Sequence, residues 1–152
     1  MADNTPAVQD NDQPLLMAEG LGKSYGRLSA CRDVSFALYP GEVLAIVGES
    51  GSGKTTLAGH LAVQAQRAGA GPVVLIDIDP QGSLADWWNE REAELPAFAQ
   101  TTVARLASDL LVLRQQGFKL AVIDTPPAIT MAIQSVIAVA ELIVVPTRPS
   151  PH

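Results

Sequence analysis

From residue 41 onward, apolar residues form short continuous runs that are separated by longer amphipathic stretches. The apolar runs occupy residues 43–47, 73–76, 120–123 and 142–145. Runs of this length without alternation are typical of parallel strands buried on both faces. The stretches with helical spacing cover residues 55–68, 83–95, 103–117 and 129–140. This repeated β-α order predicts an α/β fold, with a mainly parallel sheet flanked by helices on both faces.

The first forty residues follow a different pattern. Residues 1–13 are rich in Asp, Asn, Gln and Pro, a composition that predicts a disordered tail. Residues 14–40 contain two β-type segments, at 15–18 and 33–38, and end in the turn Tyr39-Pro40-Gly41. We expect a short antiparallel β segment ahead of the alternating part of the chain.

The sequence GESGSGKT lies between the first apolar run and the first amphipathic stretch. It fits the phosphate-binding pattern G-x-x-x-x-G-K-[ST] at every fixed position, in the required order of strand, glycine loop and helix. Lys54 is predicted to reach the β- and γ-phosphates, and the Thr55 hydroxyl to ligate Mg²⁺. The alternative is a glycine-rich turn that binds nothing. The residues expected to contact nucleotide here are Gly48, Glu49, Ser50, Gly51, Ser52, Gly53, Lys54, Thr55 and Thr56.

This motif predicts a single P-loop NTPase domain over residues 14–152, with its nucleotide-binding core from residue 41 onward. In such a sheet, ligands bind beyond the carboxyl ends of the strands. Asp77, Asp79 and Asp124 all follow apolar runs. Asp124 is predicted to bind Mg²⁺ in the manner of a Walker B aspartate. Asp79 is a candidate to orient the attacking water, and Asp77 to pair with Lys54 or Mg²⁺. The alternative for each is turn chemistry.

Composition narrows the function classes further. The chain has 152 residues, 47% hydrophobic and 17% charged, with a formal net charge of −6. This charge argues against a general nucleic-acid-binding surface. No signal peptide or transmembrane segment is apparent, so we expect a cytoplasmic protein. Cys31 is the only cysteine, which excludes an internal disulfide and a cysteine-based metal site.

Several aromatic and charged residues have ordinary structural interpretations. Trp87 and Trp88 are expected in a core or interface rather than stacked on a nucleotide. His60 has no apparent catalytic partner. The charged run at residues 89–92 is expected on a solvated helix face.

From Gly53 onward the chain resembles the ParA/MinD-type partition ATPases. The matching segments are GKTTLAGHLA, VVLIDIDPQGSLADWW, LAVIDTPP and LIVVPTRPSP. The resemblance implies an ATPase that forms a nucleotide-sandwich dimer, with ATP and Mg²⁺ as its ligands. It implies that Lys54 and Thr55 bind phosphate and Mg²⁺, that Asp79 acts in hydrolysis and that Asp124 is the Walker B residue. It also places the loop containing Pro149 near the adenine.

Residues 14–56 resemble the start of ABC-type ATP-binding subunits, in particular the phosphonate and peptide branches. The matching segments are LLMAEGLGKSYG and DVSFALYPGEVLAIVGESGSGKTT. In that family an aromatic residue at the position of Tyr25 stacks on the adenine. The alternative for Tyr25 is an ordinary tyrosine at a strand end.

The chain departs from both families. Glu49 stands where ParA-type loops carry a signature lysine, so no cross-subunit phosphate contact by that lysine is possible. The sequence has no LSGGQ-like motif, no switch histidine, and Thr125 follows Asp124 where ABC subunits place a catalytic glutamate. Because it stops at His152, we expect a chain truncated at its C-terminus relative to ParA-type proteins. We interpret it as an ABC-like front joined to a ParA-like back at the shared GSGKTT segment.

Three functions are compatible with this sequence. The first is an Mg·ATP-binding ATPase of ParA-like type whose hydrolysis is weak or impaired, or which does not turn over. The second is a non-catalytic hybrid scaffold that binds nucleotide. The third is a fragment of an ABC-type transport or phosphonate-metabolism subunit. A nucleotide-dependent homodimer is the expected assembly under the first.

Overall fold

The structure is a computed structural model that describes residues 13–48, 54–78, 83–126 and 131–146. The chain divides into two compact units, Met1–Pro40 and Gly41–His152, and each is described by itself. The tail predicted over residues 1–13 lies outside the described residues except for its last position.

The first unit contains an antiparallel ribbon of two strands, β1 (Leu16–Tyr25) and β2 (Leu28–Leu38). Two residues join the strands, and the first of them, Gly26, has a φ of 60°, which glycine adopts without strain. The predicted antiparallel β segment is confirmed. Its strands are longer than the two apolar segments because backbone pairing continues through the polar residues between them.

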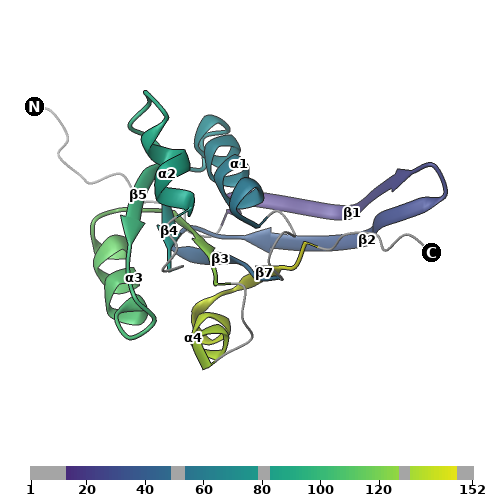
Figure 1. Cartoon of the computed structure of the whole chain (residues 1–152). Helices are drawn as coiled ribbons and strands as arrows, with labels where there is room; N and C mark the ends of the chain where they lie inside the picture. Colours follow the sequence, from purple (N-terminus) through teal and green to yellow (C-terminus); the bar gives the residue numbers. More distant parts are fainter. Residues whose placement is uncertain (1–12, 49–53, 79–82, 127–130, 147–152) are drawn as a thin grey trace, which may run out of the picture. The chain divides into compact units, whose positions relative to one another are not determined.

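The second unit is built on a five-stranded sheet in which every pair of neighbouring strands is parallel (Figure 1). The strand order is β5-β4-β6-β3-β7. This arrangement confirms the α/β fold with a mainly parallel sheet. The strands are β3 (Glu42–Ile46), β4 (Val73–Asp77), β5 (Ala97–Gln100), β6 (Leu120–Asp124) and β7 (Leu142–Val144).

Within the described residues, four helices flank this sheet: α1 (Lys54–Arg67), α2 (Ser83–Asn89), α3 (Leu106–Gln115) and α4 (Met131–Val139). The helix expected over residues 83–95 ends earlier, at Asn89, and strand β5, which the sequence pattern did not predict, follows it. Pro96 prevents the helix from continuing to residue 95, because the residue before a proline avoids helical geometry and favours an extended one. The charged run at residues 89–92 therefore lies almost wholly beyond the helix, which corrects its assignment to a helix face.

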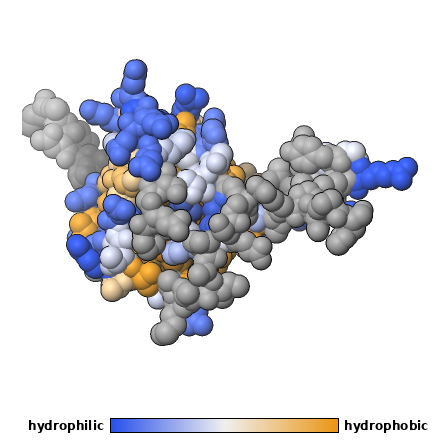
Figure 2. Space-filling model, viewed as in Figure 1, coloured by the Kyte–Doolittle hydropathy of each residue, from blue (hydrophilic) through white to orange (hydrophobic). Residues whose placement is uncertain are grey.

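Helices α3 and α4 cover one face of the sheet. Alternate residues of the strands point to this face and pack with Leu106 and Leu110 of α3 and Val136 of α4. Figure 2 shows hydrophobic residues, in orange, on the lower part of the second unit, where Figure 1 places α3 and α4. The strand residues of this apolar cluster are Val43, Ala45, Val74, Ile76, Ala121 and Ile123.

Helices α1 and α2 pack together on the opposite face. The ring of Trp87 in α2 lies against Gly59 in α1, where an added Cβ would be 2.8 Å from the ring. Trp88 stacks on Phe98 of β5, with ring centroids 5.7 Å apart, and its indole N–H donates to the Pro96 carbonyl at 2.9 Å. Both tryptophans therefore have packing roles, as expected. None of the described helices is long and apolar enough to cross a membrane.

Candidate functional site

Strands β3, β4 and β6 bring their carboxyl ends together at one edge of the sheet. Ile46 of β3 pairs with Asp124 of β6, and Asp124 pairs in turn with Asp77 of β4. Neighbouring strands lie about 4.8 Å apart, so the two aspartates are neighbours on adjacent strands. Because strand residues alternate between faces, both lie on the face opposite the apolar cluster, where α1 and α2 pack.

A hydrogen bond joins the start of α1 to the end of β6. The Thr55 hydroxyl donates to Oδ2 of Asp124 at 2.8 Å. Thr55 is in the first turn of α1 and Asp124 is the last residue of β6, and 69 positions separate them in the sequence. The fold thus brings into contact two of the three residues that the sequence named as candidate magnesium ligands, Thr55 and Asp124.

All the buried charged side chains of the described residues belong to this site. Lys54, Asp77 and Asp124 are 7%, 0% and 1% exposed. Burying ionised groups is costly unless opposite charges lie near them. One ammonium and two carboxylates leave an excess of negative charge at the strand ends, which favours a bound cation.

The donor set fits magnesium. Mg²⁺ prefers oxygen ligands and is usually held by one or two carboxylates together with substrate phosphates and water. Thr55 and Asp124 supply a hydroxyl and a carboxylate in contact, and Asp77 supplies a second carboxylate beside them. No group of three or more His, Cys, Asp or Glu side chains that could hold a metal occurs within the described ranges. A metal here would therefore depend on phosphate oxygens and water as well as on protein ligands.

Thr125 directly follows the site and is 1% exposed. Its hydroxyl donates to the Ile46 carbonyl at 2.7 Å, which ties the end of β6 to the end of β3. This role was not anticipated: the sequence marked Thr125 only as a departure from the ABC pattern. No sequence signal identifies such a bond, since it depends on the adjacency of β3 and β6.

The remaining predicted site residues are placed only in part. Gly48 lies just beyond β3, and Thr56 is exposed in the first turn of α1. The backbone of Tyr25 ends β1, but its side chain is outside the described part of the chain. The following predicted residues also lie outside it: Glu49, Ser50, Gly51, Ser52, Gly53, Asp79 and Pro149.

Comparison with known proteins gives two results, one from sequence and one from shape. The model of the ABC transporter family matches residues 31–142. The chain belongs to the ABC transporter family. Within that family, a stretch of 62 residues is 50% identical to the ribose import ATP-binding protein RbsA 2 of Streptomyces avermitilis, and covers 41% of this chain and 12% of that protein. Another, of 46 residues, is 61% identical to PhnK of Escherichia coli K12, assigned to phosphonates utilization, and covers 30% and 18%.

Two solved structures have a fold similar to that of this chain. Apo McdA of Cyanthece matches with a TM-score of 0.54 and 20% identity, over 69% of this chain and 57% of that one. A Borrelia burgdorferi B31 protein assigned to plasmid partition, bound to AMPPNP, matches with a TM-score of 0.50 and 18% identity, over 69% and 62%. At these identities the likeness concerns the fold, which is that of a P-loop ATPase. Both predicted resemblances are thus confirmed.

Proposed function

We propose that this chain binds Mg·ATP at the carboxyl ends of β3, β4 and β6 and hydrolyses it slowly. The observation that carries the proposal is the 2.8 Å hydrogen bond between Thr55 and Asp124. It joins a hydroxyl at the start of the helix after the glycine loop to a buried carboxylate on the neighbouring strand. That pair is the one a magnesium-bound phosphate requires in P-loop NTPases.

Each residue of the site has a specific role in this proposal. Lys54 neutralises the β- and γ-phosphate oxygens, and backbone N–H groups of residues 48–53 surround them. Thr55 and Asp124 hold Mg²⁺, Asp124 acting through water, and Asp77 adds negative charge beside them. The magnesium supplies charge neutralisation at the γ-phosphate. ATP is the natural nucleotide because the ABC relatives are ATP-binding proteins by name and one structural neighbour holds AMPPNP.

Slow turnover follows from two positions in the chain. The hydroxyl of Thr125 is already bonded to a backbone carbonyl, and a threonine does not serve as a general base at the position where ABC subunits use a glutamate. Glu49 replaces the lysine with which ParA-type proteins contact phosphate across a dimer. A positioned general base typically contributes 10²- to 10⁴-fold in rate.

Asp79 is the residue that we propose to orient the attacking water. Asp79→Ala should therefore remove the residual turnover.

A thermal-shift titration tests the binding half of the proposal. With Mg·ATP at about 100 times its Kd, the protein gains about 2.7 kcal/mol, which is a rise in Tm of roughly 5 to 10 °C for a chain of this size. Lys54→Ala should abolish the shift. Lys119→Ala, the same substitution just before the opposite end of β6, should retain it. Equal shifts in the wild type and Lys54→Ala, or no shift in either, would refute nucleotide binding at this site.

The family match favours a second candidate, an ATP-binding subunit for import across a membrane. The matched stretches span less than a fifth of RbsA 2 and of PhnK. This chain therefore resembles only a part of those proteins, and a role in transport is a proposal.

The two-family resemblance suggests that the chain joins an ABC-like front to a ParA-like back. In this proposal it is a cytoplasmic hybrid whose ATP-bound form dimerises. Size-exclusion chromatography with and without Mg·ATP tests the dimer, and the hybrid-scaffold alternative requires ATP binding with no turnover at all.

A further inference from the structure

A cavity of about 170 Å³ lies between α3 and the edge strand β5, on the sheet face opposite Asp77 and Asp124. Ile76 and Ala99, which pair directly across β4 and β5, form its floor. Asp109, Val112 and Leu113, spaced as one stripe of a helix, form the wall that α3 presents. Ala99 contributes only a methyl group to this floor, so a larger side chain there would enter the space.

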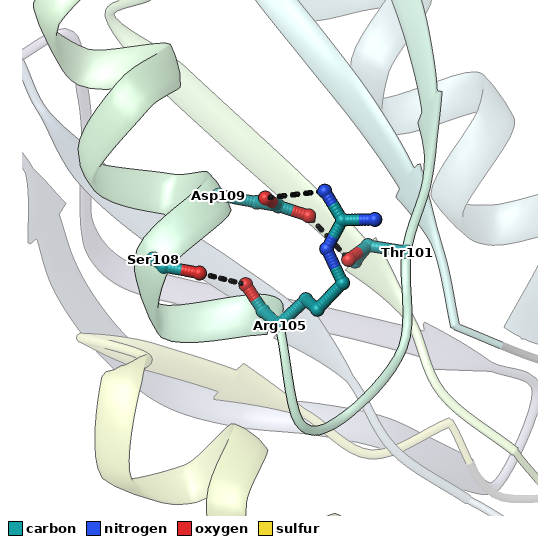
Figure 3. Close-up of polar contacts among 4 residues, drawn as sticks. All are labelled: Thr101, Arg105, Ser108 and Asp109. Carbon is teal, nitrogen blue, oxygen red and sulfur yellow. Dashed lines mark hydrogen bonds and ion pairs between the residues drawn. The ribbon is translucent and has the colours of Figure 1, made fainter.

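Thr101 and Asp109 form a polar group at one end of this cavity, and the amide of Gln116, about two helical turns beyond Asp109, also lines it. The Thr101 hydroxyl donates to Oδ2 of Asp109 at 2.5 Å, and Arg105 lies 3.7 Å from the other carboxylate oxygen (Figure 3). An ionised carboxylate accepts about four hydrogen bonds, so Asp109 retains capacity for a ligand. The half-exposed side chain of Val112 lies at the mouth, where solvent reaches the cavity.

We propose that this cavity binds a neutral, single-ring apolar molecule that carries one hydrogen-bond donor, with the ring against Ile76 and Ala99 and the donor on Asp109. A volume of about 150 Å³ is large enough for benzene, and this pocket is open to solvent, so a ligand can reach it. The carboxylate excludes anions, and Arg105 already offsets its charge, which favours a neutral donor over a cation. The site does not use the nucleotide-binding residues, so it is independent of the proposed ATP site.

Phenol, toluene and benzoate are the probes that test this assignment, with binding followed by the methyl NMR signals of Val112 and Leu113. Phenol should bind about tenfold or more tightly than toluene, since it alone gives a hydrogen bond to a charged acceptor, and benzoate should not bind. Asp109→Asn should reduce the preference for phenol to about threefold or less and leave toluene binding intact. Thr55→Val should leave both affinities unchanged, which separates this site from the nucleotide site.

Two variants that fill the cavity complete the test. Ala99→Leu from the floor and Val112→Trp at the mouth should each abolish binding of phenol and toluene, and Ala107→Leu, at an exposed position of α3, should not. If Ala99→Leu fails to fold, Val112→Trp alone tests the site. Val112 is half exposed, so the protein should tolerate a larger side chain there. Equal affinities for phenol and toluene in the wild type, binding that survives Val112→Trp, or no binding of either molecule would overturn the proposal.

Discussion

The two faces of the parallel sheet are made by alternate residues of the same strands, yet they differ in chemistry. On the face covered by α3 and α4, strand residues such as Ile76 and Ile123 form an apolar cluster. On the face covered by α1 and α2, the next residues along the same strands, Asp77 and Asp124, are equally buried but ionisable. At the carboxyl end of a strand, one residue therefore packs in the apolar cluster and the next is a candidate functional residue.

The faces also differ in how closely they are packed. On one face Trp87 contacts Gly59 so closely that no further carbon fits. On the other, Ala99 leaves a cavity of about 170 Å³ beneath α3. Close packing beside the proposed nucleotide site holds α1 and α2 together, whereas the other face leaves a cavity beneath α3.

The largest effect should come from substituting one strand residue on each face of the sheet. Ile123→Ala, on the apolar face, should lower the free energy of unfolding by about 2 to 5 kcal/mol. Asp124→Asn, one residue further, keeps a hydrogen-bond acceptor for Thr55 and should cost at most about 1 kcal/mol, while weakening Mg·ATP binding. Urea denaturation and ATP titration of both variants measure this contrast. A large stability loss in Asp124→Asn with unchanged ATP affinity would make Asp124 a packing residue.

The difference in packing should appear in two substitutions that each enlarge a side chain. Gly59→Ala should destabilise the protein by about 1 to 3 kcal/mol because its Cβ meets the Trp87 ring. In a Trp87→Phe background the cost of Gly59→Ala should fall, since the smaller ring retreats from the clash. Ala99→Leu should cost less than Gly59→Ala, because it fills existing space. The reverse order of the two effects would contradict the packing described for the two faces.

Thr125 lies at the boundary of the site, and its variants separate structure from catalysis. Thr125→Val leaves the buried Ile46 carbonyl without its hydroxyl donor and should cost about 1 to 3 kcal/mol. Thr125→Ser keeps the bond and should be near neutral. Neither variant should lower the ATPase rate of the folded protein, measured as phosphate release. A rate loss in Thr125→Ser would indicate that Thr125 takes a direct part in turnover.

The smallest effect is expected at the surface of α3. Arg105 is 74% exposed and lies 3.7 Å from Asp109, and exposed ion pairs of this kind contribute about 1 kcal/mol or less. Arg105→Ala should therefore leave the melting temperature almost unchanged. A loss similar to that of Gly59→Ala would mean that the Arg105–Asp109 pair supports the wall of the cavity.

Much of this architecture could be predicted because its signals are local. Residues 120–123 are continuously apolar and are followed by an aspartate, which is enough to predict β6 and the position of Asp124. The glycine loop and the helical spacing after it likewise predicted α1 with Lys54 and Thr55 at its start. The contact between Thr55 and Asp124 agrees with the rule that the carboxyl ends of parallel strands lie at the same edge of the sheet.

The parts that could not be predicted depend on tertiary pairing. Strand β5 reads Ala-Phe-Ala-Gln, and alanine and glutamine have little β-propensity of their own; the segment is extended because it pairs with β4. The Thr125 bond and the cavity beneath α3 also require the positions of elements distant in sequence. Periodicity along the chain contains no information about either.

The central claim, a magnesium-dependent nucleotide site built on the Thr55–Asp124 contact, is tested most directly by measuring ATP affinity with Mg²⁺ and with EDTA. The wild type should bind ATP at least about tenfold more tightly with Mg²⁺, since hydrogen bonds and contacts to charged groups contribute about 1.5 kcal/mol or more. Thr55→Val should lose this dependence on Mg²⁺, whereas Thr102→Val, the same substitution at an exposed position, should keep it. An equal dependence on Mg²⁺ in the wild type and Thr55→Val, or none in the wild type, would contradict the account.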